Sequence, residues 1–122
     1  MTEPYVRAGK INWIAKGSNV GVQERTLSPG QVIPWHYHTI ITDTTYCLEG
    51  TVQIELLDPP ERVLLSAGQS QAIATNRPHQ ITAHGDVPCR MLLVQGVANT
   101  IAIRSILIVG NHPGCGDLRH WS

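Results

Sequence analysis

Residues 30–50 read GQVIPWHYHTIITDTTYCLEG, and the histidines in this stretch decide which fold is expected. His36 and His38 lie two apart in a segment rich in β-branched and aromatic residues, which favour strands. Side chains at positions i and i+2 of a strand project from the same face, so both imidazoles can converge on one point. Asp43 follows after a gap long enough for a turn or a strand crossing. The stretch therefore predicts strands that carry a cluster of metal-binding side chains.

The rest of the chain also consists of short apolar runs separated by Gly, Pro, Asn and Asp. This pattern is typical of an all-β sandwich or barrel. In residues 51–56 apolar and polar side chains alternate, so one face of that strand is expected to be buried. No window predicts a helix of three turns. The predicted strands are residues 20–27, 32–37, 44–49, 51–57, 61–65, 71–74, 80–83 and 91–97.

The composition limits both the size of the protein and its partners. With 122 residues, a formal net charge of zero and 15% charged residues, the chain is expected to form one domain that binds neither nucleic acid nor anionic membranes. The longest apolar stretch, residues 101–109, is far shorter than the roughly 20 residues of a membrane span. Three cysteines without a C-x-x-C pair, and an N-terminus without an apolar signal segment, predict a cytoplasmic protein.

His79 adds a third imidazole to the candidate cluster, because it follows a proline at the start of another predicted strand. Three imidazoles and one carboxylate form a mixed nitrogen and oxygen donor set that suits Mn, Fe, Co, Ni or Zn. A lone H-x-H pair is weak evidence for a metal site, since histidine pairs on strands also serve packing or surface roles. The spacing of the surrounding glycines is more specific.

From Gly30 the sequence runs five residues to His36, one to His38, four to Asp43 and six to Gly50. This spacing resembles the first motif of the cupin superfamily, G-x5-H-x-H-x3-4-E-x6-G, with Asp43 in place of the glutamate. The shorter aspartate leaves open whether this carboxylate would bind a metal directly or through water.

Gly68 and His79 resemble the glycine and histidine of the second cupin motif, G-x5-P-x-G-x2-H-x3-N. The match is weaker here, because Ala74 replaces the proline, Asn76 the second glycine and Ala83 the asparagine. The resemblance covers residues 21–97 and leaves residues 98–122 as a C-terminal extension, in which residues 101–109 are expected to form an added strand or a short helix.

The resemblance implies a small jelly-roll β-barrel with a metal site inside it. The implied ligands are His36, His38, Asp43 and His79, and the implied cofactor is one divalent transition metal per chain. Mn or Fe is favoured, with Ni, Co or Zn as further candidates. Because cupins are commonly dimers, a homodimer is expected as well.

Several other side chains are candidates for binding a substrate. Thr45 and Cys47 share the strand parity of Asp43, although a small buried residue is the simpler role for Cys47. Gln95 interrupts an apolar strand, and Arg77 precedes His79 in a turn, where it is either a solvated charge or a carboxylate clamp. His84, His112 and His120 are expected at the surface. Trp35 and Tyr37 face away from the two histidines, to pack under another segment or in a dimer interface.

The function expected from these residues is a metal-dependent enzyme that acts on a small neutral or mono-anionic molecule. Dioxygenase, decarboxylase, isomerase and lyase chemistry all remain open by resemblance. The alternatives are a binding or sensing module without turnover, and a degenerate cupin without metal. The interior is predicted to be apolar and poor in cations, with Val32, Ile54, Ile73 and Ile81 among its lining residues, which disfavours a heavily anionic substrate such as a sugar phosphate.

Overall fold

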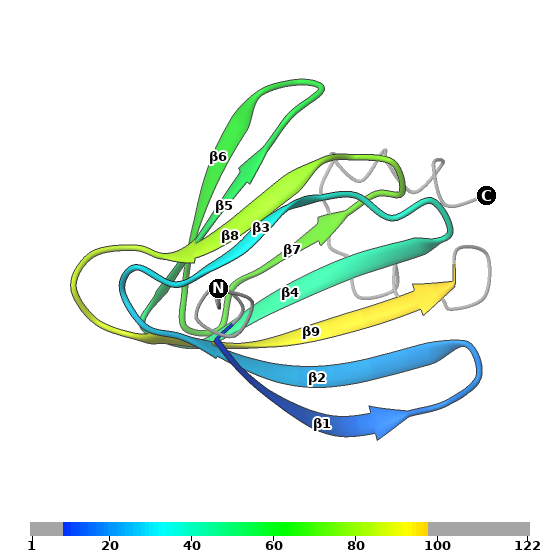
Figure 1. Cartoon of the computed structure of the whole chain (residues 1–122), viewed down its shortest axis with the longest axis horizontal. Helices are drawn as coiled ribbons and strands as arrows, with labels where there is room; N and C mark the ends of the chain where they lie inside the picture. Colours follow the sequence, from blue (N-terminus) through cyan, green and yellow to red (C-terminus); the bar gives the residue numbers. More distant parts are fainter. Residues whose placement is uncertain (1–8, 98–122) are drawn as a thin grey trace, which may run out of the picture.

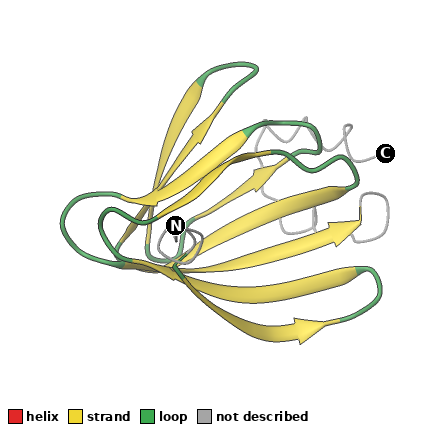
Figure 2. Ribbon diagram, in the orientation of Figure 1, coloured by secondary structure: helices red, strands yellow, loops and turns green. Residues whose placement is uncertain are grey.

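The computed structural model describes residues 9–97, and this part of the chain is built from strands without any helix (Figures 1 and 2). The all-β prediction is therefore confirmed. The strands are β1 (Lys10–Lys16), β2 (Val20–Leu27), β3 (Val32–His36), β4 (Ile41–Glu49), β5 (Thr51–Leu56), β6 (Glu61–Ser66), β7 (Ser70–Ile73), β8 (His79–Ala83) and β9 (Cys89–Val97).

The strands form two antiparallel sheets that face each other as a jelly roll. One sheet has the order β1-β2-β9-β4-β7 and the other the order β3-β8-β5-β6. Figure 1 shows the second sheet lying above the first. The jelly roll agrees with the prediction, but the expected barrel needs a correction: among the described strands, no pairing between the sheets closes them into one continuous barrel.

The core lies between the sheets and is mostly aliphatic, because the chain contains no phenylalanine. Both sheets contribute through alternating strands. In β5, for example, Val52, Ile54 and Leu56 are buried while the residues between them are half-buried. The buried apolar residues are Leu27, Ile33, Cys47, Val52, Ile54, Leu56, Leu65, Ile73, Ile81, Cys89, Met91 and Leu93.

Strand β1 was not predicted, and its environment explains why. It is an edge strand that pairs only with β2 among the described strands, and all of its residues are exposed. The alternation of its first four residues ends at Trp13, after which Ile14 and Ala15 are both apolar, so the pattern is too short to identify a strand with one buried face. Each of the other strands overlaps a predicted one. The predicted strand or helix at residues 101–109 lies outside the described residues.

No helix long and apolar enough to cross a membrane is found in residues 9–97.

Candidate metal centre

The fold brings together the four residues whose spacing resembles the cupin motifs. His36 ends β3, His38 follows it, Asp43 lies in β4 and His79 begins β8. The pairing of β3 with β8 sets His36 directly opposite His79. One ligand atom from each of the four residues lies within 4.8 Å of the others.

Two of the imidazoles are each oriented by a hydrogen bond to the backbone carbonyl two residues earlier in the chain. His36 Nδ1 donates to the carbonyl of Pro34 at 2.7 Å, and His79 Nδ1 donates to the carbonyl of Arg77 at 2.8 Å. Because a carbonyl only accepts, each Nδ1 carries the proton, and Nε2 of the neutral ring keeps its lone pair. A backbone carbonyl behind a histidine is the arrangement that fixes metal ligands in proteins.

The centre of the cluster holds polar atoms that have no hydrogen-bond partner. Asp43 Oδ2 lies 3.3 Å from His38 Nε2 and 3.6 Å from His79 Nε2. Yet His38 Nε2, His79 Nε2 and Asp43 Oδ1 are all buried without a hydrogen bond to any described residue. Buried polar atoms are normally satisfied, and leaving them unpaired destabilises the fold. A cation bound among these atoms would satisfy them.

The electrostatics keep two of these groups in the forms that bind metal. Burial lowers the pKa of His36, which favours the neutral imidazole. Burial alone would raise the pKa of Asp43, but its contacts with His38 and His79 outweigh that effect and lower the pKa to about 2. The contact with Asp43 in turn raises the pKa of His38, against the effect of burial. An ionised carboxylate and neutral imidazoles are what a metal ion requires.

The aspartate reaches the centre of the cluster despite its short side chain. Metal–ligand bonds to histidine and carboxylate are about 2.0–2.2 Å long, so donors on opposite sides of one ion lie about 4 Å apart. The four donor atoms lie within 4.8 Å of one another. The shorter side chain of Asp43 therefore still reaches the cluster, in contact with His38 and His79.

Asn76 explains how the second motif functions without its glycine. Its φ of 68° lies in the left-handed region, which asparagine tolerates better than other residues with a side chain. Its backbone N–H donates to the carbonyl of His38 at 2.6 Å. The turn before β8 thus holds the segment that carries His38.

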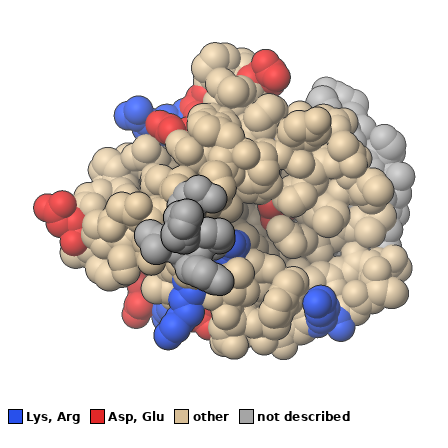
Figure 3. All heavy atoms as spheres, in the orientation of Figure 1, with Lys and Arg blue, Asp and Glu red and all other residues tan. Residues whose placement is uncertain are grey.

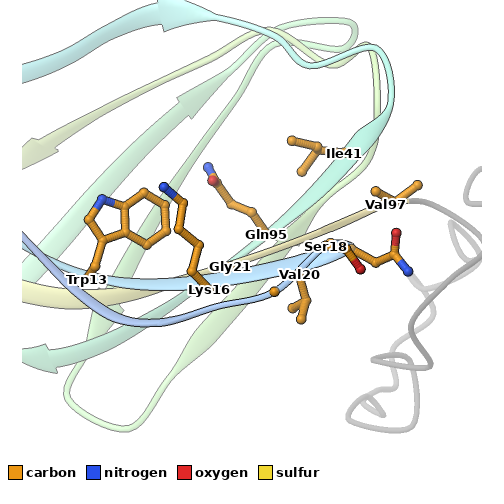
Figure 4. A pocket seen from close by; sticks show the side chains of 11 residues that line it. Trp13, Lys16, Ser18, Val20, Gly21, Ile41, Gln95 and Val97 are labelled. Carbon is orange, nitrogen blue, oxygen red and sulfur yellow. The ribbon is translucent and has the colours of Figure 1, made fainter.

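Thr45 and Gln95 lie close to the cluster in the strand register. Thr45 is fully buried two positions after Asp43, and its hydroxyl has no hydrogen-bond partner among the described residues. Gln95 pairs directly with Asp43 across β4 and β9. It also lines an open pocket of about 190 Å³, together with Trp13, Lys16 and Gly21 (Figure 4).

Cys47 and Arg77 have structural partners instead. The thiol of Cys47 points to the carbonyls of Glu49 and Gly50, inside the core. The guanidinium of Arg77 donates to two carbonyls on the segment between β5 and β6, Leu57 O at 3.0 Å and Pro59 O at 2.8 Å, and to Glu61 Oε1 at the start of β6 at 3.0 Å. Arg77 contributes to the site through its carbonyl, which orients His79.

Sequence reasoning missed two buried polar residues of β2. Gln23 is 7% exposed and Arg25 is 9% exposed. The prediction of an interior poor in cations was therefore wrong. The pattern that could have revealed them is strand parity, because Leu27 is buried on the same strand and residues 23 and 25 share its face.

Trp35, Tyr37 and His84 lie away from the cluster. Trp35 is 45% and Tyr37 57% exposed, so the expected packing under another segment is not found among the described residues. His84 is exposed and its Nδ1 contacts the side-chain oxygen of Gln53 at 2.9 Å. His112 and His120 lie outside the described residues.

Comparison with known proteins places this geometry in a family. Residues 23–95 match the model of the cupin domain family. A search of curated proteins finds no match. Among solved structures, a cupin protein from Bacteroides fragilis is 27% identical, with a TM-score of 0.62 and coverage of 69% of this chain and 70% of that chain.

Two further solved structures share the fold at lower identity. A conserved protein with a double-stranded β-helix domain from Klebsiella pneumoniae is 19% identical, with a TM-score of 0.67, covering 81% of this chain and 85% of that one. KdgF from a Halomonas species is 16% identical, with a TM-score of 0.65, covering 80% and 84%.

Proposed function

Because the chain belongs to the cupin domain family, whose model matches residues 23–95, we propose that it is a metal-dependent enzyme acting on a small organic molecule. The proposed cofactor is one divalent transition metal ion per chain, Mn or Fe in the first place, with Ni, Co or Zn as further candidates. Its proposed ligands are His36, His38, Asp43 and His79.

The observation that carries the proposal is the set of unpaired donor atoms at the centre of the cluster. Nε2 of His38 and of His79 and Oδ1 of Asp43 are buried, close together and without hydrogen bonds. A side-chain cluster that served packing alone would pair such atoms with one another or with the backbone. Three imidazoles and a carboxylate also leave open coordination positions on an ion that takes five or six ligands.

Four residues around the cluster have distinct parts in this proposal. The carbonyls of Pro34 and Arg77 hold the rings of His36 and His79 in place. The unpaired hydroxyl of Thr45 and the amide of Gln95 are the groups that orient a substrate beside the cluster. When bound, the ion would supply Lewis-acid or dioxygen chemistry.

Metal content tests the ligand assignment. Elemental analysis of the purified protein, and of protein reloaded with Mn or Fe, is expected to give about one ion per chain. His79→Ala should abolish retention of the metal, because it removes a buried donor. His84→Ala is the matched control and should leave the metal content unchanged, since His84 is exposed and contacts Gln53. Equal metal loss in both variants, or none in either, would contradict the assignment.

Turnover tests the enzymatic part of the proposal separately. The metal-loaded protein is screened against small hydroxy acids, keto acids and phenols while oxygen uptake and product formation are measured. The metal-free protein and Asp43→Ala serve as controls that should both be inactive. Full metal loading without turnover of any compound would instead favour a binding module.

A further inference from the structure

Arg25 is a buried cation that the metal site does not use. It is 9% exposed, its Nε has no hydrogen-bond partner, and within residues 9–97 no carboxylate lies at ion-pair distance from it. Burying a guanidinium is costly unless hydrogen bonds and an opposite charge compensate for the lost water. The arrangement of Arg25 therefore requires an explanation beyond packing.

The strand register directs Arg25 into the space between the sheets. Arg25 pairs with Met91 in β9, and Met91 pairs with Cys47 in β4, both of which belong to the core. Directly opposed residues of antiparallel strands point to the same face. Asp43, four residues before Cys47 in β4 and therefore on the same strand face, lies in this interior as well.

The charges of this interior favour the binding of an anionic ligand. Asp43 is the charged group whose field acts on Arg25: burial lowers the pKa of Arg25 and Asp43 opposes that shift. In the metal-free protein this carboxylate opposes the effect of burial only from a distance, since its close contacts are with His38 and His79. A divalent ion at the cluster would bind the carboxylate of Asp43. The positive charges of the ion and of Arg25 would then exceed the negative charge of this interior. Figure 3 shows a hollow in this face of the molecule, with acidic and basic atoms visible at its edge.

We propose that Arg25 binds a carboxylate group of the substrate, and that the substrates are therefore small organic acids. This inference rests on the proposed function, since it places the other end of the same molecule at the metal cluster. A planar guanidinium suits a carboxylate because it donates two parallel hydrogen bonds, and the unpaired Nε–H is available for one of them. Gln23, buried on the same face of β2, adds a polar neighbour to this subsite.

Paired ligands separate this role from a purely structural one. Glycolate, lactate, pyruvate, malonate and succinate are each compared with the corresponding amide by calorimetry on the zinc-loaded protein, because zinc is redox-inert. At least one acid is expected to bind about tenfold or more tightly than its amide, as a charge-assisted hydrogen bond requires. Arg25→Met should reduce this preference to about threefold or less. Arg62→Met removes an exposed arginine and should leave the preference unchanged.

A second readout follows Arg25 directly in the zinc-loaded wild-type protein and uses a variant only to assign the signal. In the wild-type protein the Nε–H resonance of Arg25, identified by its loss in Arg25→Lys, should shift on titration with the preferred acid and not with its amide. The inference is overturned if no acid binds better than its amide, if Arg25→Met keeps the preference, or if the resonance does not respond. The zinc content of the same samples is measured independently, so a failure of the metal site is recognised separately.

Discussion

Replacing Gly50 by alanine should destabilise the protein more than the same change at Gly30 or Gly68, the two motif glycines whose surroundings are open. Gly50 lies between β4 and β5 with a φ of 74°. A Cβ built there would lie 2.4 Å from the carbonyl oxygen of Pro88 and 3.0 Å from Cα of Cys89. Both contacts are with backbone, so no side-chain rotation relieves them.

The expected loss of stability has two parts. A left-handed conformation costs a residue with a side chain about 1–2 kcal/mol. Forcing the backbone at Pro88 and Cys89 apart adds about 1–3 kcal/mol, the usual cost of overpacking. The sum, about 2–5 kcal/mol, is a large share of the about 5–15 kcal/mol that stabilises a typical domain.

Gly68 provides the matched control, because it has a φ of 90° and a Cβ added there would meet nothing within 4 Å beyond its chain neighbours. Gly68→Ala should therefore lose only the conformational part, about 1–2 kcal/mol. Urea unfolding followed by tryptophan fluorescence measures both variants against the wild type. Asparagine, which tolerates a positive φ, should recover stability at position 68 but not at position 50, where the contact is made by Cβ itself.

The reasoning is refuted if Gly50→Ala and Gly68→Ala lose the same free energy of unfolding. That result would mean that the connection between β8 and β9 moves aside without cost. Recovery by Gly50→Asn would lead to the same conclusion, because it would leave only the conformational part at this position.

Three further predictions concern other parts of the molecule. Arg77→Met should lower the free energy of unfolding by about 1–3 kcal/mol in urea titrations, because three acceptors lose their donor, whereas Arg62→Met should change it little. Cys89 should resist alkylation in the folded protein at pH 8, as peptide mass spectrometry can measure, because burial first and the neighbouring Cys47 second raise its pKa to about 11 and only the thiolate reacts. The homodimer expected by resemblance should appear in analytical ultracentrifugation and weaken in Trp35→Ala, whereas a monomeric wild type would contradict it.

The sequence predicted the elements whose side chains alternate or whose spacing is specific. Each of β2 to β9 overlaps a predicted strand, and His36, His38, Asp43 and His79 meet within 4.8 Å. These features depend on local periodicity and on turns that glycine and asparagine mark. Strand β1 lies beyond such reasoning, because an exposed edge strand has no buried face to impose a pattern.

The partners of Arg77 and the burial of Arg25 were not predicted from local sequence patterns. The partners of Arg77 lie on residues 57–61, far along the chain, so no spacing rule connects them to its turn. Arg25 could have been placed inside by its parity with Leu27, but a charged residue on a strand is normally assigned to the solvent face. Its burial becomes understandable only when Asp43 is known to face the same interior.

The candidate site combines parts that are fixed locally with parts that depend on the whole fold. His36 and His79 each receive their orientation from the carbonyl two residues before them, so three consecutive residues suffice to aim each ring. Asp43 and His38 depend on β4 and on the bond from Asn76, which distant segments supply. Because the unpaired donor atoms weaken the metal-free fold, a bound ion would stabilise it by an amount that grows with the logarithm of its affinity for the folded state. The same buried atoms that cost stability without metal are therefore the ones that make the site selective for a cation.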